Sequence, residues 1–347
     1  MTGDDVDEPL RHADLNRRSD FDPALRPRSL DEFVGQDRVR QNLRIAIQAA
    51  SLRGECLEHL LLSGLPGLGK TTLSHIIAAE QGSEMRVTSG PALERTGDLV
   101  GILSSLKRGD ILFIDEIHRL PRILEEYLYS AMEDLVVDII IDQGPGARSV
   151  RLPLEPFTLI GATTREGLLT APFRARFGLQ EKLELYPASD LCLVLRRTAR
   201  LLNVQVDEAA FALIAERSRG TPRIANRLLR RVRDLADVRG ERRIGLALGD
   251  ETLDRLGIDE AGLVETDRKI LRCLERHGGG PAGIKTLAAA VGESEDTLET
   301  VYEPYLLTVG FLSKTPRGRM LTPHGFRHLN AAAPNRPGSA DQPGLFP

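Results

Sequence analysis

Residues 60–72 read Leu60-Leu61-Leu62-Ser63-Gly64-Leu65-Pro66-Gly67-Leu68-Gly69-Lys70-Thr71-Thr72. An apolar run of strand length leads into a glycine-rich turn, and the turn ends in Lys-Thr-Thr where a helix is expected over residues 73–80. This is the pattern Gly-x-x-x-x-Gly-Lys-Thr of a phosphate-binding loop. Its glycines let backbone N–H groups approach a polyphosphate, and the helix N-terminus adds the positive end of its dipole. The stretch predicts that Lys70 bridges the β- and γ-phosphates of a nucleotide and that the Thr71 hydroxyl binds Mg²⁺.

The composition is that of a soluble globular protein. The 347 residues suffice for about two or three domains, and 41% hydrophobic and 28% charged residues are ordinary values. Because the net charge is only −4, any DNA contact has to come from a local basic patch. The three cysteines are far apart and form no Cys-x-x-Cys pair, which fits a reducing compartment. The acidic N-terminus and the lack of a run of about 18 apolar residues exclude a signal peptide and a membrane span, so we expect a cytoplasmic location.

A second motif lies downstream at Asp110-Ile111-Leu112-Phe113-Ile114-Asp115-Glu116-Ile117-His118. An apolar run that ends in two acids after a phosphate-binding loop is the Walker B arrangement. In it Asp115 supports Mg²⁺ and Glu116 polarises the attacking water. Another buried strand is expected over residues 157–163, and Thr164 after it is placed to hydrogen-bond the γ-phosphate or the attacking water.

Strands and helices alternate over residues 20–186, with a last short strand expected at residues 183–186. This order predicts an α/β domain with a parallel sheet and helices on both faces. Before the first strand, Leu25, Val34 and Gly35 suit a pocket for the adenine base. A plain N-terminal packing arm explains the same segment equally well, and the sequence leaves both readings open.

Residues 135–154 read as a β-hairpin around a Gly-Pro-Gly turn. Val137, Ile139 and Ile141 fall on one face, while Val136 and Ile140 fall on the other. A hairpin that lies on a core needs only one apolar face, so the second indicates a protein-binding patch. The alternative is a strand buried on both sides within the domain.

The C-terminal half is predicted to be helical and then winged-helix. Within residues 187–257, Arg223 stands at a helix start beside Pro222 and is the best functional candidate, whereas the cluster Arg227, Arg230, Arg231 and Arg233 reads as a solvated helix face. Residues 264–330 show three helical patterns and two short strands, with Lys314, Arg317 and Arg319 around the turn and no acid in residues 311–330. We expect this wing to contact DNA phosphates, the alternatives being a surface turn or a protein contact.

The predicted organisation has five parts. They are a flexible tail (1–20), an ATPase domain (21–186), a helical lid (187–257), a winged-helix domain (258–330) and a disordered tail (331–347).

The chain resembles the AAA+ ATPases and, more narrowly, the RuvB family of bacterial Holliday-junction branch-migration motors. The resemblance runs from about residue 25 to 322, and its most specific stretches are Gly220 to Arg233 and Thr315-Pro316-Arg317-Gly318-Arg319-Met320. Two departures are visible, because the family usually has Pro where this chain has Leu65 and often has Arg where it has Lys314. Backbone groups make the phosphate contacts at Leu65, so binding should survive there, whereas Lys314 loses the bidentate option of Arg.

The resemblance implies an ATPase that uses Mg²⁺ and works as a homohexameric ring. It implies that Thr164 is sensor 1, that Arg223 is sensor 2 and that Arg176 is an arginine finger in the neighbouring subunit's site. The remaining nucleotide-binding positions that it implies are Leu25, Arg26, Gly67, Gly69, Lys70, Thr71, Thr72, Glu133, Asp134, Leu135 and Tyr186. It further implies that the hairpin binds RuvA, that the wing touches duplex DNA and that the RuvC resolvase acts on the same junction. The process so implied is branch migration in homologous recombination and DNA repair.

Three other classes compete with this interpretation. A clamp loader usually carries a collar domain in place of a wing. A protein unfoldase needs an aromatic pore loop and often a protease partner, and the chain has no His-Glu-x-x-His motif. A non-enzymatic winged-helix regulator would not need both Glu116 and Arg176.

Overall fold

The computed structural model describes residues 25–140 and 149–330. They form two compact units that meet in sequence between Arg230 and Arg231, so the predicted helical lid contributes to both. The two predicted tails lie outside the described residues. Among the described helices, none has the length and apolar character needed to cross a membrane.

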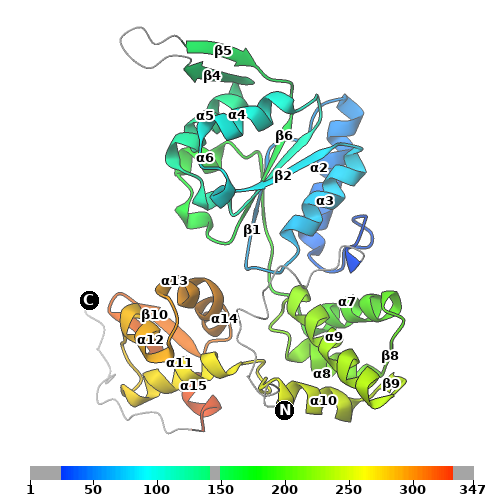
Figure 1. Cartoon of the computed structure of the whole chain (residues 1–347), viewed down its shortest axis with the longest axis vertical. Helices are drawn as coiled ribbons and strands as arrows, with labels where there is room; N and C mark the ends of the chain where they lie inside the picture. The colour runs from blue at the N-terminus through cyan, green and yellow to red at the C-terminus, as the bar shows by residue number, and fades with distance from the viewer. Residues whose placement is uncertain (1–24, 141–148, 331–347) are drawn as a thin grey trace, which may run out of the picture. The chain divides into compact units, whose positions relative to one another are not determined.

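A five-stranded parallel sheet forms the centre of the first unit (Figure 1). Its strands are β1 (Leu60–Ser63), β2 (Met85–Ser89), β3 (Ile111–Asp115), β6 (Thr158–Thr163) and β7 (Leu179–Lys182), in the order β2-β3-β6-β1-β7. The central strands are buried along their whole apolar runs because helices cover both faces. The predicted α/β class is confirmed.

One predicted strand is wrong. The last strand is β7, and residues 183–186 leave the sheet after the Leu183 N–H donates to Ser63 O at 2.8 Å. The Glu184 N–H donates to the Gln36 side chain and the Tyr186 N–H to Gly220 O, so both find partners outside the sheet. The alternation of apolar residues in this stretch comes from packing, not from strand pairing.

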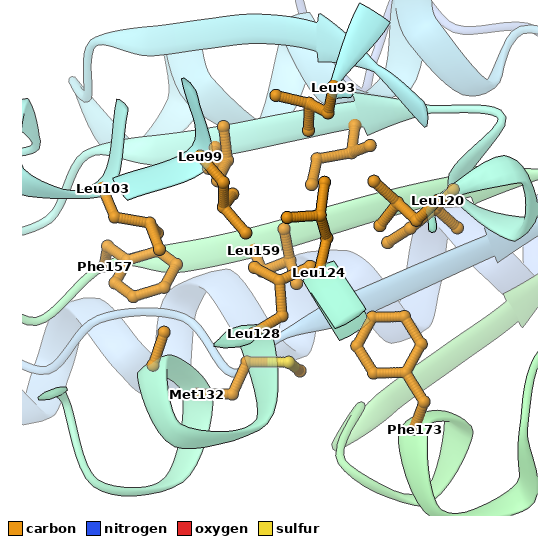
Figure 2. Packing of buried hydrophobic residues seen from close by; sticks show 14 of the residues in the cluster. Leu93, Leu99, Leu103, Leu120, Leu124, Leu128, Met132, Phe157, Leu159 and Phe173 are labelled. Carbon is orange, nitrogen blue, oxygen red and sulfur yellow. The ribbon is translucent and has the colours of Figure 1, made fainter. Parts of the chain in front are cut away.

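Helices α2 (Asp37–Arg53) and α3 (Lys70–Gln81) lie on one side of the sheet, with α4 (Thr96–Ser105), α5 (Arg122–Glu133) and α6 (Ala171–Ala175) on the other. Figure 2 shows the apolar core beneath α4 and α5, where Leu99, Leu124 and Leu128 pack with Phe173. Helix α4 begins at Thr96, where the Asp98 carboxylate accepts the Arg95 N–H and fixes the helix start.

The predicted hairpin is present as β4 (Val136–Ile140) and β5 (Ser149–Pro153), which pair antiparallel. At its base Val137 is fully buried in the domain core, whereas Val150 on β5 is 45% exposed. Ile141 and the side chains of Ile139 and Ile140 lie outside the described part of the chain. On the other face Asp138 pairs with the exposed Arg151, so the base of the hairpin is not buried on both sides, and the protein-binding patch stays a prediction.

The helical region comprises α7 (Ala188–Leu201), α8 (Glu208–Glu216), α9 (Pro222–Arg239) and α10 (Leu246–Arg255), with two-residue strands β8 (Gln205–Val206) and β9 (Arg243–Ile244). Pro222 opens α9, as expected from its fixed φ. The expectation of a solvated arginine face on α9 is wrong for Arg227, which is 5% exposed. It lies beside Leu228, which is fully buried.

The winged-helix part consists of α11 (Glu265–Arg276), α12 (Ile284–Val291), α13 (Glu295–Thr297), a π-helical turn (Leu298–Tyr302), α14 (Glu303–Thr308), the strands β10 (Leu312–Thr315) and β11 (Gly318–Leu321), and α15 (Pro323–His328). The two strands pair antiparallel and form the predicted wing.

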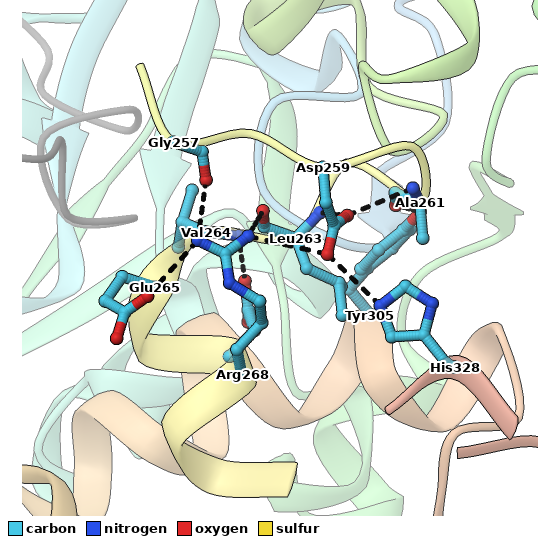
Figure 3. A network of polar contacts seen from close by, with 10 residues as sticks. Gly257, Asp259, Ala261, Leu263, Val264, Glu265, Arg268, Tyr305 and His328 are labelled. Carbon is cyan, nitrogen blue, oxygen red and sulfur yellow. Dashed lines mark hydrogen bonds and ion pairs between the residues drawn. The ribbon is translucent and has the colours of Figure 1, made fainter. Parts of the chain in front are cut away.

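The connection between α10 and α11 is held by a polar network (Figure 3). The Asp259 carboxylate accepts the N–H groups of Ala261 and Leu263 at 3.0 and 2.8 Å and lies 3.1 Å from His328 Nε2. Arg268 donates to Gly257 O at 2.9 Å and to Leu263 O at 2.9 Å. Side-chain hydrogen bonds therefore order the connection between α10 and α11.

Candidate active site

The phosphate-binding loop joins β1 to α3 as predicted, and it makes close contacts on both sides. Lys70 is 7% exposed, and its Nζ donates to Gly64 O at 2.7 Å and Leu65 O at 3.0 Å. Gly67 has φ +83°, and a Cβ there would lie 2.7 Å from Thr221 Cγ2, so only glycine fits. Because Leu65 acts through its carbonyl, its departure from the family pattern leaves the loop's backbone contacts in place.

The charges around Lys70 show which side chains converge on the loop. Burial lowers the pKa of Lys70 to about 8, the acids Glu116 and Asp115 raise it, and Arg223 lowers it. These residues come from the loop, from the end of β3 and from the start of α9. A partly desolvated ammonium in such a place gains from an anionic phosphate, which favours its charged form.

Glu116 directly follows β3 and is held at a φ of +50°. Its N–H donates to Asp115 Oδ1 at 3.0 Å, and its Oε2 accepts the Thr164 hydroxyl at 3.2 Å. Burial and then the neighbouring Asp115 raise the pKa of the Glu116 carboxyl. Strands β3 and β6 are neighbours in the sheet, so their carboxyl ends bring Glu116 and the predicted sensor Thr164 together.

The donor set at the predicted metal position suits Mg²⁺. Thr71 in the first turn of α3 supplies a half-buried hydroxyl, and Asp115 supplies a half-buried carboxylate at the end of β3. Hard oxygen ligands of this kind are those that Mg²⁺ prefers in proteins. Thr72, the next residue of the loop, is buried in α3.

Arg223 lies against the phosphate-binding loop. Its N–H donates to Gly67 O at 3.4 Å, and a Cβ on Gly67 would lie 3.0 Å from the Arg223 Cβ. The structure thus brings together Lys70, Glu116, Thr164 and Arg223, which lie far apart in the sequence.

Of the predicted base-binding residues, Tyr186 lies next to the loop. Leu25 and Tyr186 are buried, and the Tyr186 hydroxyl donates to Leu68 O at 3.4 Å. A Cβ on Gly35 would lie 2.7 Å from the Tyr186 ring, so the segment fits closely over this tyrosine. Arg197 of α7, which the sequence did not single out, donates to Leu25 O and Arg26 O at 2.6 and 3.1 Å. Burial lowers the pKa of Arg26.

Arg176 contacts a different set of residues at the end of α6. Its guanidinium lies 3.0 Å from the Glu133 carboxylate and 4.5 Å from the centre of the Tyr129 ring, and it donates to Pro172 O at 2.9 Å. Glu133 ends α5, Asp134 follows it, and Leu135 begins the hairpin with its carbonyl accepting the Leu154 N–H at 2.7 Å. The predicted finger and the acidic positions predicted with it therefore lie side by side on one part of the domain.

The wing corrects one predicted site residue. Arg319 is 6% exposed and its guanidinium bonds the carboxylates of Glu303 and Glu299, the latter at 2.7 Å. Lys314, its cross-strand neighbour, lies 3.4 Å from Glu299, whereas Arg317 at the turn is exposed. The expectation that no acid cancels the field of the wing is wrong, because these acids come from the preceding helices. Arg319 is a structural residue, and DNA contact through it is not supported.

This ion pair leads to a prediction about stability. Arg319→Ala leaves the Glu303 carboxylate, 5% exposed, without its guanidinium partner. Breaking a buried ion pair in this way costs about 3–5 kcal/mol. We expect thermal unfolding of the variant at a clearly lower temperature, while Arg317→Ala, at an exposed position, keeps the wild-type Tm. Equal melting of the two variants would contradict the assignment.

Comparison with known proteins finds matches over nearly all of the described residues. Three family models match: the Holliday junction DNA helicase RuvB P-loop domain at residues 25–183, the RuvB AAA lid domain at 186–259 and the RuvB C-terminal winged helix domain at 260–330. A Myxococcus xanthus protein named Holliday junction branch migration complex subunit RuvB is 57% identical over 91% of this chain and 93% of its own length. A protein of the same name from Kosmotoga olearia is 58% identical over 89% of this chain and 90% of its own length.

The fold also matches a solved structure, the Thermotoga maritima RuvB Holliday junction branch migration motor. The TM-score is 0.82 at 51% identity, over 90% of this chain and all of that one. Matches in sequence and in structure thus cover the phosphate-binding domain, the lid and the winged helix together. The chain therefore belongs to the RuvB family of P-loop AAA+ ATPases.

Proposed function

We propose that this protein is the ATP-hydrolysing subunit of a motor that drives branch migration of Holliday junctions in recombination and repair. The observation that carries the proposal is the convergence of Lys70, Glu116, Thr164 and Arg223 on one loop. These are the residue types that an ATPase needs to bind and hydrolyse ATP. The same chain also has a winged helix, on which Arg317 is exposed. The clamp-loader alternative is not favoured, because all three family models are those of RuvB.

Each residue at the site has a proposed part in hydrolysis. Lys70 and the loop amides hold the β- and γ-phosphates, and Thr71 and Asp115 hold Mg²⁺, which when bound neutralises charge on the phosphate oxygens. Glu116 orients the attacking water and accepts its proton. Thr164 and Arg223 hold the γ-phosphate end of the site. Leu25, Arg26 and Tyr186 line the pocket for the base, and Gly69 is the N-cap of the helix whose N-terminus faces the phosphates.

The proposed assembly is a homohexameric ring around duplex DNA. Arg176, with Glu133, Asp134 and Leu135, is proposed to face the nucleotide of the neighbouring subunit. The curated relatives are named as subunits of a branch migration complex, which supports a partnership with RuvA. RuvC is proposed to act on the same junction.

A junction-dissociation assay tests the function. A labelled four-way junction is incubated with the protein, Mg²⁺ and ATP, with and without RuvA. We expect dissociation that needs ATP and is strongly stimulated by RuvA, and none with Lys70→Ala. ATPase activity that responds to a protein substrate but not to junction DNA with RuvA would favour a remodelling ATPase of another kind.

The hairpin leads to a prediction about the partner. Val150 is 45% exposed and pairs across the hairpin with Ile139, so a change there does not disturb the core residue Val137. We expect Val150→Glu to keep basal ATPase activity and to lose RuvA-dependent loading onto junctions, because a charge in an apolar interface is costly. Binding to RuvA is measured by titration, with Val150→Ala as the milder control. Unchanged binding of Val150→Glu would remove the hairpin from the interface.

The wing leads to a prediction about DNA. A motor that moves junctions through any sequence has to rely on phosphate contacts, and each such contact contributes about 0.9 to the salt slope of binding. We expect Arg317→Ala to lower the slope by about that amount on every sequence, and Lys314→Ala to lower it less, because Lys314 already pairs with Glu299. Salt titrations of duplex affinity measure this, with Lys107→Ala as an exposed control outside the wing. An unchanged slope would make the basic residues of α9 the next candidate.

A further inference from the structure

His118 is a buried residue close to the water-activating acid. It lies in the short turn after Glu116, and its side chain is 5% exposed. Its Nδ1 is 2.9 Å from the Thr163 Oγ1 and 3.4 Å from the Glu116 Oε2. The imidazole therefore links the carboxyl end of β3 with the last residue of β6.

Both contacts bear on the orientation of the Glu116 carboxylate. The oxygen near His118 is Oε2, which also accepts the Thr164 hydroxyl at 3.2 Å. One hydrogen bond and one close imidazole contact thus converge on the same carboxylate oxygen, and the backbone at Glu116 has an unusual φ of +50° that directs the side chain.

The imidazole nitrogen Nδ1 is the one that faces the Thr163 hydroxyl and the Glu116 carboxylate. The Thr163 Oγ1 already accepts the Arg165 N–H at 3.0 Å and retains acceptor capacity, since a hydroxyl has two lone pairs. With a proton on Nδ1, the N–H points to the side where the Thr163 Oγ1 and the Glu116 Oε2 lie, at 2.9 and 3.4 Å. With Nδ1 unprotonated, the Thr163 hydroxyl is the donor of the hydrogen bond, and the Nδ1 lone pair faces the Glu116 carboxylate. A favourable contact with Glu116 therefore requires the first tautomer.

We propose that His118 is a positioning residue for ATP hydrolysis, which holds the Glu116 carboxylate in the orientation needed to accept a proton from the attacking water. The inference rests on the proposed role of Glu116. The alternative is a purely structural role, in which the buried imidazole connects β3 to β6. Backbone pairing already joins those strands from Ile111 to Ile114, so the connection does not depend on His118. A misplaced catalytic group costs about 10²-fold in rate, so the expected loss is large enough to measure.

Three substitutions at this position separate positioning from structure. In His118→Asn the amide nitrogen occupies nearly the place of Nδ1 and donates toward Glu116. In His118→Gln the amide extends toward the place of Nε2, and in His118→Ala no donor remains. We expect His118→Ala and His118→Gln to lower kcat roughly 10- to 100-fold, and His118→Asn to recover most of it, with KM and ATP affinity unchanged in all three.

The measurements are steady-state ATPase kinetics, ATP affinity and thermal unfolding, with Glu116→Gln in parallel. A normal kcat for His118→Ala beside an inactive Glu116→Gln would overturn this inference and leave the proposed function standing. Normal turnover by Glu116→Gln would overturn both. If His118→Ala unfolds, the pair His118→Gln and His118→Asn decides the question: the inference requires a lower kcat for His118→Gln than for His118→Asn at unchanged ATP affinity, and equal kcat values overturn it.

Discussion

Lys70→Ala loses nucleotide binding, whereas Glu116→Gln binds ATP normally and loses turnover. The first change removes the ammonium that we propose to face the β- and γ-phosphates, and this ammonium lies at the loop, 2.7 Å from Gly64 O. The second keeps the size of the side chain but removes the carboxylate that we propose to accept the proton from water. General-base catalysis contributes about 10²- to 10⁴-fold, so we expect a rate loss of that order.

Binding of a fluorescent ATP analogue and release of phosphate measure the two properties separately. Lys107→Ala and Glu94→Gln make the same chemical changes at exposed positions and serve as matched controls. We expect both controls to bind and hydrolyse ATP at wild-type rates. Normal hydrolysis by Glu116→Gln would move the water-activating role to another residue.

Arg176→Ala loses nearly all ATPase activity while it keeps ATP binding, and mixing it with Lys70→Ala restores part of the activity. An arginine finger contributes about 10³- to 10⁵-fold. Within its own chain Arg176 contacts Glu133 and Tyr129 of α5, and neither belongs to the set of residues around Lys70. In a mixed ring, an intact Lys70 site meets an intact Arg176 at some interfaces, and only these hydrolyse ATP.

Native mass spectrometry establishes that mixed rings form, and ATPase activity is then followed against the mixing ratio. Arg174→Ala is the matched control, since Arg174 lies on the same short helix and pairs with Glu166 at 3.8 Å. We expect Arg174→Ala to stay active. Mixed rings without any recovered activity would indicate that Arg176 acts within its own subunit, or that Arg174 is the finger.

Much of this molecule follows from local sequence. One short stretch of sequence specifies each of four features: the phosphate-binding loop, the Walker B acids, the hairpin and the two-stranded wing. Their geometry depends on glycines, on turn residues and on apolar runs of fixed length. The structure has each of them where it was predicted. The order of these motifs was also enough to predict a parallel sheet, since alternating strands and helices have few other ways to pack.

The tertiary structure decided which charges are paired. Arg319 was predicted to contact DNA because no acid lies near it in the sequence, yet Glu299 and Glu303, 20 and 16 residues earlier, neutralise it. Arg227 was expected to be exposed to solvent, but its position on α9 is buried. His118 and Thr163 are 45 residues apart, and only the pairing of β3 with β6 brings them together.

The same physical reason underlies all of these cases. A motif that works through its own backbone is determined by neighbouring residues, so the sequence by itself determined the nucleotide-binding loop, the acids after β3 and the wing. Whether a charged or polar side chain is free to act depends on partners that arrive from distant parts of the chain. Only the tertiary structure decided that Arg317 is exposed on the wing while Arg319 is buried, and that Glu116 shares its carboxylate oxygen with Thr164 and His118.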